Sequence, residues 1–313
     1  MDLSNLTTVA TRRDLERMGV SRDRITAALR SGSLVSVAPG YYMRPASIGA
    51  FPEHEHLALA RAVQAGMSPG TALAEVAAAI NHGLPVVGAD LSRVRLVRPG
   101  GTASGTQRTS VSVLTRNVTG DELVFVDGCL TTTVPRTVVD LARRDSVRTA
   151  VIVGDAALHR GLTTRHELEH RLAAAGPMRG ARRAREIVAM LDGRAESPLE
   201  SWSRLVIGRS NLPSPDIQHE VRDRGRLVAR VDFWWEEFGV VGECDGMGKY
   251  FGQYSEKSLR EVLDEEKFRA QELVDLGYVV VRWSWDELLR RPDVVLARIE
   301  RAINRARALR RVS

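Results

Sequence analysis

The 313-residue sequence has few cysteines and few aromatic residues: Cys129 and Cys244 are its only cysteines, and aromatic side chains make up 5% of it. Two cysteines are too few for a disulfide framework or for a zinc site built on cysteines. No apolar run approaches the roughly 18 residues that a membrane-spanning helix needs. The first ten residues also lack the basic and apolar segments of a secretory signal. We therefore expect a soluble, cytoplasmic protein with no membrane contact.

The chain is long enough for two or three domains, and it carries an excess of positive charge. A hydrophobic fraction of 43% is ordinary for a globular protein, so extended disorder is not expected. The formal net charge is +6 and the pI is about 9.8. Taken alone, this surplus would fit nucleic acid, an anionic membrane surface or an acidic protein as a partner.

Helix-start and turn signals predict two short helices and a hairpin at the N-terminus. Thr11 and Asp14 have the spacing of a capping box at the start of the first helix. Ser21 caps a second helix over residues 22–30, and the alternating residues that follow predict a β-hairpin. These are the elements of a winged helix-turn-helix, whose second helix enters the major groove of DNA.

The predicted DNA contacts are polar side chains on two helices. On the second helix the candidates are Arg22, Arg24, Thr26 and Arg30. Arginine contacts to phosphates supply affinity, whereas base contacts supply specificity. Arg182 and Arg183 lie on a further predicted helix, which we interpret as a basic linker that is either simply solvated or in contact with phosphate. A winged helix used for protein contacts is the alternative for the N-terminal segment.

The middle of the chain and the C-terminal part have different patterns. The middle mixes helical and strand-like stretches without a repeat and without a catalytic constellation. From Ser197 onward the order is definite: a helix, three strand-like runs, a long helix, an apolar strand and a final helix. The last strand is apolar throughout, which is typical of a buried strand.

Two acids of the C-terminal part are expected to face each other across a hairpin. If residues 236–239 form the turn, Trp235 pairs with Val240 and Asp232 with Glu243, whose Cβ atoms would lie about 5 Å apart. Period-two alternation adds Asp245 to the same face. Carboxylates so close repel unless a proton or a cation lies between them, so the pattern predicts a divalent-metal site. Mg²⁺ or Mn²⁺ fits such oxygen ligands best. The alternative is an exposed hairpin whose charges face water.

At these residues the sequence resembles the restriction-endonuclease-like, or PD-(D/E)xK, superfamily and its very-short-patch-repair-type branch. The segments that carry the resemblance are Glu196–Glu200, Arg230–Asp232, Glu243–Gly246, Lys249–Tyr250, Glu266–Lys267 and Gly277–Trp283. The resemblance implies a DNA endonuclease in which Glu200, Asp232 and Glu243 bind the metal. Glu200 has a second interpretation, because it is also the N3 residue of a capping box that begins at Ser197.

One position departs from the superfamily pattern. The superfamily has a lysine two residues after the second acid, where this sequence has Asp245. Such a lysine would orient the attacking water or stabilise negative charge in the transition state. Lys249 and Lys267 are the candidates to replace it, so the expected catalytic set is Asp232, Glu243, Asp245, Lys249 and Lys267.

The N-terminal half resembles abortive-infection type IV antitoxin-like proteins. The matching segments are Thr11–Leu15, Gly19–Ser21, Ile25, Gly32–Leu34, Pro39–Tyr42 and, more weakly, Thr132–Asp140. Two functions follow: a Mg²⁺-dependent DNA endonuclease positioned by its winged helix, or a non-catalytic, antitoxin-like DNA-binding regulator with a degenerate nuclease fold. DNA is the expected partner, and both a partner protein encoded nearby and a homodimer stay open.

The sequence thus predicts an α/β multidomain protein with four parts. They are a winged helix (1–48), an α+β middle domain (49–176), a basic linker helix (177–195) and a restriction-endonuclease-like domain with an αβββαβα core (196–313).

Overall fold

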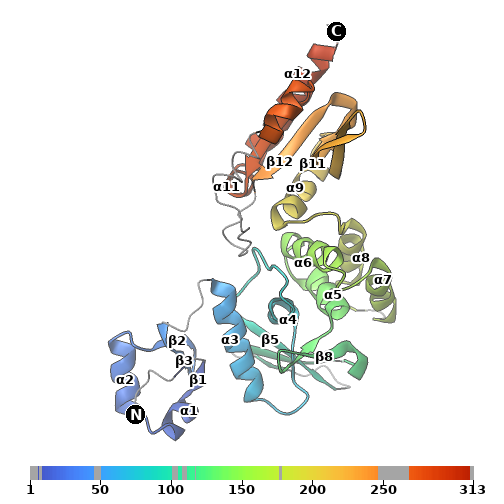
Figure 1. Ribbon diagram of the computed structural model, residues 1–313. Coiled ribbons are helices and arrows are strands. Elements are labelled where there is room, and N and C mark those ends of the chain that lie inside the picture. The colour runs from blue at the N-terminus through green and yellow to red at the C-terminus, as the bar shows by residue number, and fades with distance from the viewer. Residues whose placement is uncertain are drawn as a thin grey trace. The chain divides into compact units, whose positions relative to one another are not determined.

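The computed structural model describes residue 6 and residues 9–45, 51–100, 105–107, 111–116, 118–175, 178–245 and 268–310. The chain divides into two compact units, Met1–Leu191 and Asp192–Ser313. Both units combine helices with β-sheet, so the chain is a mixed α/β protein (Figure 1). No helix in the described residues is long and apolar enough to cross a membrane.

The first unit begins with two short helices and a small sheet, as the capping signals predict. Its elements are β1 (Ala10–Thr11), α1 (Arg12–Arg17), α2 (Arg22–Arg30), β2 (Val35–Ala38) and β3 (Tyr41–Met43). The sheet has the order β1-β3-β2. The capping box of Thr11 and Asp14 forms, and Ser21 accepts a hydrogen bond from the Arg24 N–H. Both predicted helix starts are therefore confirmed.

A six-stranded sheet follows, in the order β6-β7-β5-β4-β9-β8. Its strands are β4 (Ala72–Leu73), β5 (Val94–Pro99), β6 (Gly105–Gln107), β7 (Val111–Arg116), β8 (Leu123–Val126) and β9 (Cys129–Thr132). Helices α3 (Pro52–Ala65) and α4 (Glu75–Asn81) pack against it through a core that includes Leu59, Leu73 and Leu96. The sequence pattern predicts one helix over residues 71–82, but Ala72 and Leu73 pair with β5 and β9 instead.

The first unit ends in four helices that pack around one another (Figure 1). They are α5 (Val134–Arg144), α6 (Val147–His159), α7 (Arg165–Ala174) and α8 (Ala181–Met190). Helix α8 buries Ala184, Ile187 and Val188 and contacts α5, α6 and α7. The predicted linker helix is therefore a packed helix of the first unit, and the boundary between the units follows it at Leu191.

The second unit contains a four-stranded sheet in the order β10-β11-β12-β13. Its elements are α9 (Pro198–Gly208), β10 (Asp216–Asp223), β11 (Arg226–Trp235), β12 (Val240–Asp245), β13 (Val279–Ser284), α11 (Trp285–Arg290) and α12 (Pro292–Arg310). The first three strands are antiparallel, whereas β13 runs parallel to β12. Residues 268–275 form a helix before β13. Helix α11 was not expected from the sequence.

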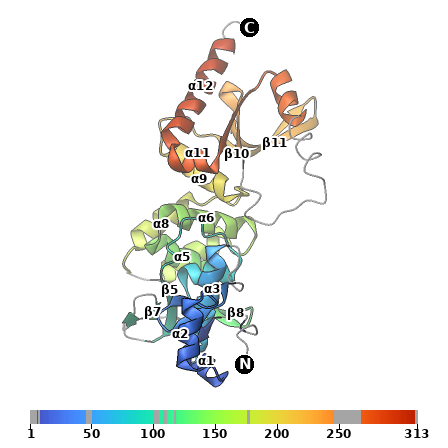
Figure 2. The same ribbon diagram turned by 90° about the vertical axis from the view of Figure 1, so that its left-hand side faces the viewer.

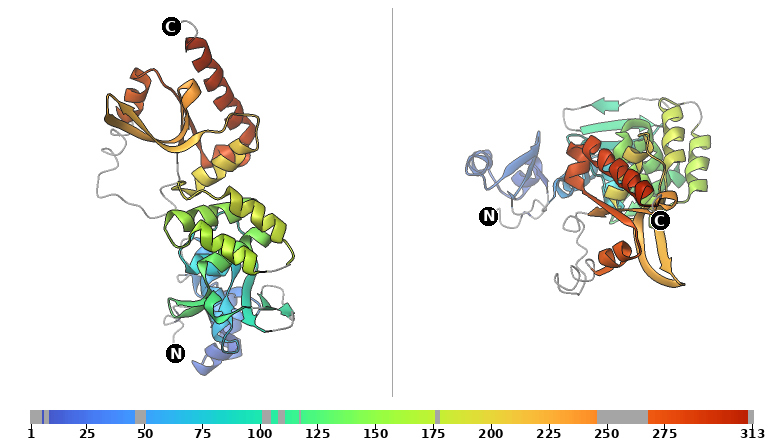
Figure 3. Two further views of the ribbon diagram at one scale, coloured as in Figure 1. Left: turned by 90° about the vertical axis from the view of Figure 1, so that its right-hand side faces the viewer. Right: turned by 90° about the horizontal axis from the view of Figure 1, so that it is seen from above.

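Two separate cores lie against this sheet, which is seen from other directions in Figures 2 and 3. Phe233, Trp235 and Trp283 belong to a core that includes residues of α9 and α12. Val231, Val241 and Leu273 belong to another. Regular alternation would have grouped Val231 with Phe233 and Trp235, but the structure assigns it to the other core.

Gly242 of β12 lies where aromatic side chains leave no room for a larger residue. A Cβ atom there would lie 2.7 Å from Trp283 Cη2 and 3.0 Å from both Phe233 Cβ and Trp235 Cζ3. We expect Gly242→Ala to lower the free energy of unfolding of the second unit by roughly 1–3 kcal/mol, because an overpacked core must shift. Thermal unfolding measures this change. In the control Gly208→Ala the new methyl group meets nothing within 4 Å, and equal losses in both variants would contradict the prediction.

Candidate functional site

Asp232 lies where the hairpin of β11 and β12 opens. The predicted register is confirmed by the pairs Trp235 with Val240 and Phe233 with Gly242. The pairing stops there, one step before Asp232 and Glu243 would meet. Instead, the backbone N–H of Cys244 donates to Asp232 Oδ2 at 2.7 Å. The side chain of Asp232 thus replaces a backbone acceptor at the point where the two strands separate.

Gln218 connects Asp232 to a second carboxylate. Its φ of +54° lies in the left-handed region, which few residues other than glycine adopt. The Gln218 Nε2 donates to Glu200 Oε2 at 2.7 Å and to Asp232 Oδ1 at 3.3 Å. One amide nitrogen therefore contacts both acids, which brings the carboxylates of α9 and β11 together.

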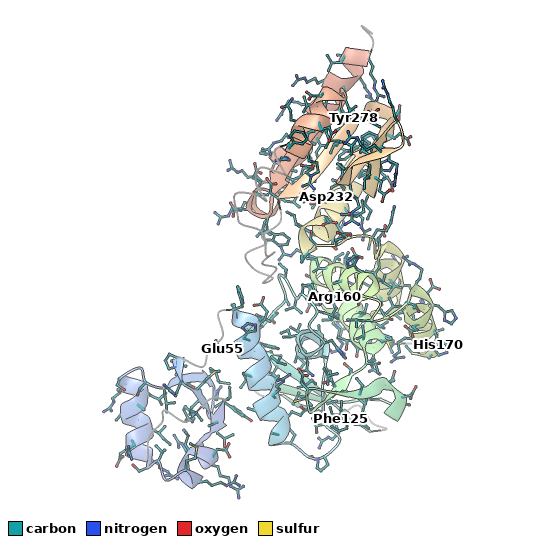
Figure 4. The ribbon with its side chains drawn as sticks, viewed as in Figure 1. Glu55, Phe125, Arg160, His170, Asp232 and Tyr278 are labelled. Atoms are coloured by element: carbon teal, nitrogen blue, oxygen red, sulfur yellow. The ribbon has the colours of Figure 1, made fainter. Side chains whose placement is uncertain are left out.

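The buried Glu200 has only part of the capping role that its position predicts. Ser197 accepts a hydrogen bond from the Glu200 N–H, as a helix cap should. The Glu200 carboxylate, however, accepts from the Glu196 N–H at 3.0 Å and from Gln218. A complete capping box would also need a hydrogen bond from the Ser197 N–H to the Glu200 carboxylate. The described residues do not form that hydrogen bond. The carboxylate instead shares the Gln218 amide with Asp232, whose place in the second unit is labelled in Figure 4.

A cavity of about 220 Å³ lies beside these acids. Its lining side chains, which we call the carboxylate pocket, are Glu196, Gln218, Arg230, Asp232, Glu243, Cys244, Asp245 and Arg269. Three of the acids predicted for the site therefore line this pocket: Asp232, Glu243 and Asp245. Asp245 is exposed and Glu243 is largely buried.

The acids of the pocket change the proton affinity of Asp232. Burial raises the pKa of Asp232 to about 7, and the negative charges of Glu200 and Glu243 act in the same direction. The hydrogen bonds from Cys244 and Gln218 oppose this rise without cancelling it. No cationic side chain in the described part of the chain is among the causes of this shift, so Asp232 loses its proton less readily than a free carboxyl group does.

Glu243 already has a cationic partner. It is paired in register with Arg282 of β13, and Arg282 Nη2 lies 2.5 Å from Glu243 Oε2. The Arg282 carbonyl accepts in turn from Arg298 Nη1 at 2.6 Å. In the sequence, Arg282 stands out only as part of a motif. The ion pair is not predictable there, because it depends on the parallel register of two strands that more than thirty residues separate.

The chemistry of the pocket suits Mg²⁺ or Mn²⁺, although no ready cage exists. Within the described ranges, no three His, Cys, Asp or Glu side chains form a group that could hold a metal ion. Mg²⁺ does not require such a group, since it is usually held by one or two carboxylates together with waters and substrate phosphates. Burial raises the pKa of Asp232, and a cation in the pocket would offset the burial of its charge. The donor set therefore fits a hard divalent cation.

The two lysines predicted for the site cannot be placed relative to the pocket. Lys249 and Lys267 both lie outside the described residues. Two arginines line the pocket instead, Arg230 and Arg269. Neither these arginines nor Gln218 were assigned a role in the site from the sequence. No local pattern distinguishes them from ordinary surface residues.

The predicted DNA-binding residues of the first unit fall into two groups. Four are exposed on helix α2: Arg22, Arg24, Thr26 and Arg30. Arg182 of α8 is also exposed and pairs with Glu186 at 2.9 Å. Arg183 is different, because its guanidinium donates to the carbonyls of Ala142 and Asp145. That contact ties α8 to the end of α5, so the structure gives Arg183 a packing role.

The fold and the pocket define a mixed α/β protein of two units with a carboxylate site in the second. Two proteins of Mycobacterium tuberculosis are similar to it: the uncharacterized protein MT2308 of strain CDC 1551 / Oshkosh and the uncharacterized protein Rv2248 of strain ATCC 25618 / H37Rv. Each is 34% identical over 200 residues, which cover 64% of this chain and 71% of the relative. The chain belongs to the same family as these proteins. No protein-family model matches it.

Proposed function

We propose that the chain is a metal-dependent DNA endonuclease whose second unit is a restriction-endonuclease-like domain. The observation that carries the proposal is that Asp232 and Glu243 line one pocket where two strands separate, and that Gln218 joins Glu200 to Asp232. The strand order, with a hairpin joined to a parallel fourth strand, agrees with the αβββαβα core that the resemblance implies. In hydrolysis, a water oxygen bonds to phosphorus while the bond from phosphorus to one sugar oxygen breaks, and a proton from the water leaves that sugar oxygen as a hydroxyl group.

One or two of the carboxylates of Asp232, Glu243 and Glu200 would hold the ion, and waters and substrate phosphate oxygens would complete its ligands. When bound, Mg²⁺ or Mn²⁺ would activate water and offset negative charge at phosphorus. Gln218 keeps the Glu200 and Asp232 carboxylates together before a cation arrives. The partial burial of the acids keeps bulk water from screening their charges.

We also propose that residues 1–48 form a winged helix that positions the protein on DNA. In support, α2 is short, amphipathic and capped, and a small sheet follows it. Its exposed face carries three arginines, of which Arg22 lies 3.4 Å from the Glu16 carboxylate of α1. The middle of the first unit would be the antitoxin-like domain that the resemblance implies.

A non-catalytic, antitoxin-like DNA-binding regulator is the second candidate function. The ion pair between Glu243 and Arg282 favours it, because an acid already neutralised needs no metal. Asp245, in the position where the superfamily has lysine, favours it too. In this case the nuclease fold would serve as a scaffold, and DNA binding would not depend on a divalent cation.

Cleavage of plasmid DNA tests the two candidates against each other. The full-length protein is incubated with supercoiled plasmid in Mg²⁺, Mn²⁺ or EDTA. Nicked or linear products that depend on the metal support the endonuclease. DNA binding that is equally tight in EDTA, with no cleavage over a broad panel of duplex, single-stranded and mismatched substrates, supports the regulator.

The role of α2 is tested separately by a salt titration. We expect Arg22→Ala together with Arg24→Ala to weaken DNA binding and to make the plot of log affinity against log salt less steep by about 0.9 for each phosphate that the protein no longer neutralises. A gel-shift titration at several salt concentrations measures both quantities. Arg301→Ala together with Arg305→Ala, which removes two exposed arginines of α12, is the matched control. If the double variant and the control give the same slope, α2 does not contact DNA.

A further inference from the structure

The arginines in and around the carboxylate pocket differ in how they are paired. Arg282 is bound to Glu243 at 2.5 Å. Arg230 Nη2 lies 2.7 Å from Glu196 Oε2. Arg269 lines the same pocket but makes no hydrogen bond or ion pair within the described part of the chain. It is therefore the pocket arginine whose guanidinium is available to a ligand.

Among the described residues, two acids that line the pocket with Arg269 form their hydrogen bonds and ion pairs with other groups of the protein and not with Arg269. Glu243 is paired with Arg282, and Asp232 accepts hydrogen bonds from Cys244 and Gln218. A guanidinium stays charged at any pH that proteins experience and presents five N–H donors in a rigid plane. Within the part of the chain that the structure describes, this charge has no carboxylate partner in an acidic pocket, and it therefore suits an incoming anion.

The backbone that carries Arg269 is anchored, although the side chain is exposed. Arg269 lies in the helix of residues 268–275, and four residues later Leu273 is completely buried against Val231 and Val241. The same two strands carry Asp232 and Glu243. The position of the helix is thus fixed relative to the acids by a shared core, while the guanidinium is free to contact a ligand.

We propose that Arg269 binds the phosphate of the DNA substrate beside the carboxylates and takes the place of the lysine that the resemblance expects at Asp245. The inference rests on the proposed endonuclease function. The planar fork of arginine matches two non-bridging phosphate oxygens, a geometry for which arginine is the preferred residue. Donors directed at a phosphate whose negative charge grows in the transition state also speed the reaction.

The test compares Arg269→Gln with Arg301→Gln in the full-length protein. Both arginines are exposed residues of the second unit, but Arg301 is on α12 and does not line the pocket. Three quantities are measured: the single-turnover cleavage rate in Mg²⁺, the salt dependence of DNA binding with Ca²⁺ in place of Mg²⁺, and Mn²⁺ binding by electron paramagnetic resonance. Ca²⁺ serves as a hard cation with the same preference for oxygen ligands.

For Arg269→Gln we expect the cleavage rate to fall by about 10²–10³-fold. The log–log salt slope should become less steep by about 0.9, which corresponds to one phosphate fewer neutralised by the protein. Mn²⁺ affinity should be unchanged or higher, because a positive charge has left the pocket. Arg301→Gln should match the wild type in all three. This combination supports the inference, since a merely structural residue would weaken metal binding as well.

The other outcomes separate the inference from the proposed function. If the wild type cleaves DNA and Arg269→Gln equals Arg301→Gln in rate and slope, the inference is overturned and the endonuclease stands. A tenfold loss of Mn²⁺ affinity in Arg269→Gln also overturns it, because Arg269 would then support the acids. If the wild type cleaves nothing but the salt slope of Arg269→Gln is still less steep by the same amount, the endonuclease fails and the phosphate contact is supported.

Discussion

Asp232→Asn is expected to reduce DNA cleavage by more than about 100-fold and, in the absence of metal, to make the second unit more stable. Loss of a partner that only orients a metal ligand costs about 10–100-fold, and loss of a ligand should cost more. The asparagine keeps an oxygen that can accept from the Cys244 N–H. It also removes the charge that Glu200 and Glu243 repel. Activity and stability should therefore change in opposite directions in one variant.

The gain in stability should depend on pH. The folded-state pKa of Asp232, about 7, lies above its ordinary value of 3.8. The folded state therefore binds this proton more tightly than the unfolded state does. The resulting stability is fully present below pH 3.8 and is lost as the pH rises through about 7. At about 1.4 kcal/mol per pKa unit, the wild type loses up to roughly 4 kcal/mol over this range.

Thermal unfolding of both proteins in EDTA from pH 4.5 to pH 8.5 measures this difference. Asp232→Asn has no carboxyl group to titrate, so its advantage should grow through that range and level off above about pH 7.5. Glu300→Gln, a change at an exposed acid of α12, should give no such trend. A difference between Asp232→Asn and the wild type that stays constant with pH would show that Asp232 is an ordinary surface acid. Saturating Mn²⁺ should reduce the difference, since it binds only the folded wild type tightly.

The hairpin that carries the site was predictable because turn length determines strand register. Four residues between Trp235 and Val240 set the pairing, and the structure has that pairing. Helix starts at Thr11, Ser21 and Ser197 were predictable for a similar reason, since capping depends on residues close together in the sequence. Local chemistry was enough for these elements.

What the sequence did not reveal depends on contacts between distant segments. Gln218 joins Glu200 to Asp232 only because an irregular residue of β10 lies between α9 and β11. Arg183 looks like a solvent-facing cation until α5 and α8 pack and its guanidinium meets two backbone carbonyls. Strand β4 is only two residues long, too short for its propensity to show, and its pairing with β5 and β9 defines it.

Arg136→Met is expected to destabilise the first unit by about 3–5 kcal/mol. Arg136 is 2% exposed and lies between two acids, with Nη1 2.7 Å from Glu122 Oε2 and Nε 2.7 Å from Asp140 Oδ2. Arg143 and Arg171 hold the remaining oxygens of these acids. Methionine is of similar length but carries no charge, so it leaves the buried Asp140 and the partly buried Glu122 each short of one partner. Loss of one member of a buried ion pair typically costs this much.

Urea unfolding combined with hydrogen exchange of the first unit measures the effect. Arg182→Met serves as the control, because it breaks an exposed pair with Glu186 at a site that is 91% exposed. Such pairs contribute between about 0 and 1 kcal/mol. The double variant Arg136→Met with Asp140→Leu should recover part of the loss, since it removes a buried charge along with its partner. A loss below about 1 kcal/mol in Arg136→Met would mean that Arg143 and Arg171 suffice for both acids. The network would then be redundant in the segment, Thr132–Asp140, that carries the weaker antitoxin-like resemblance.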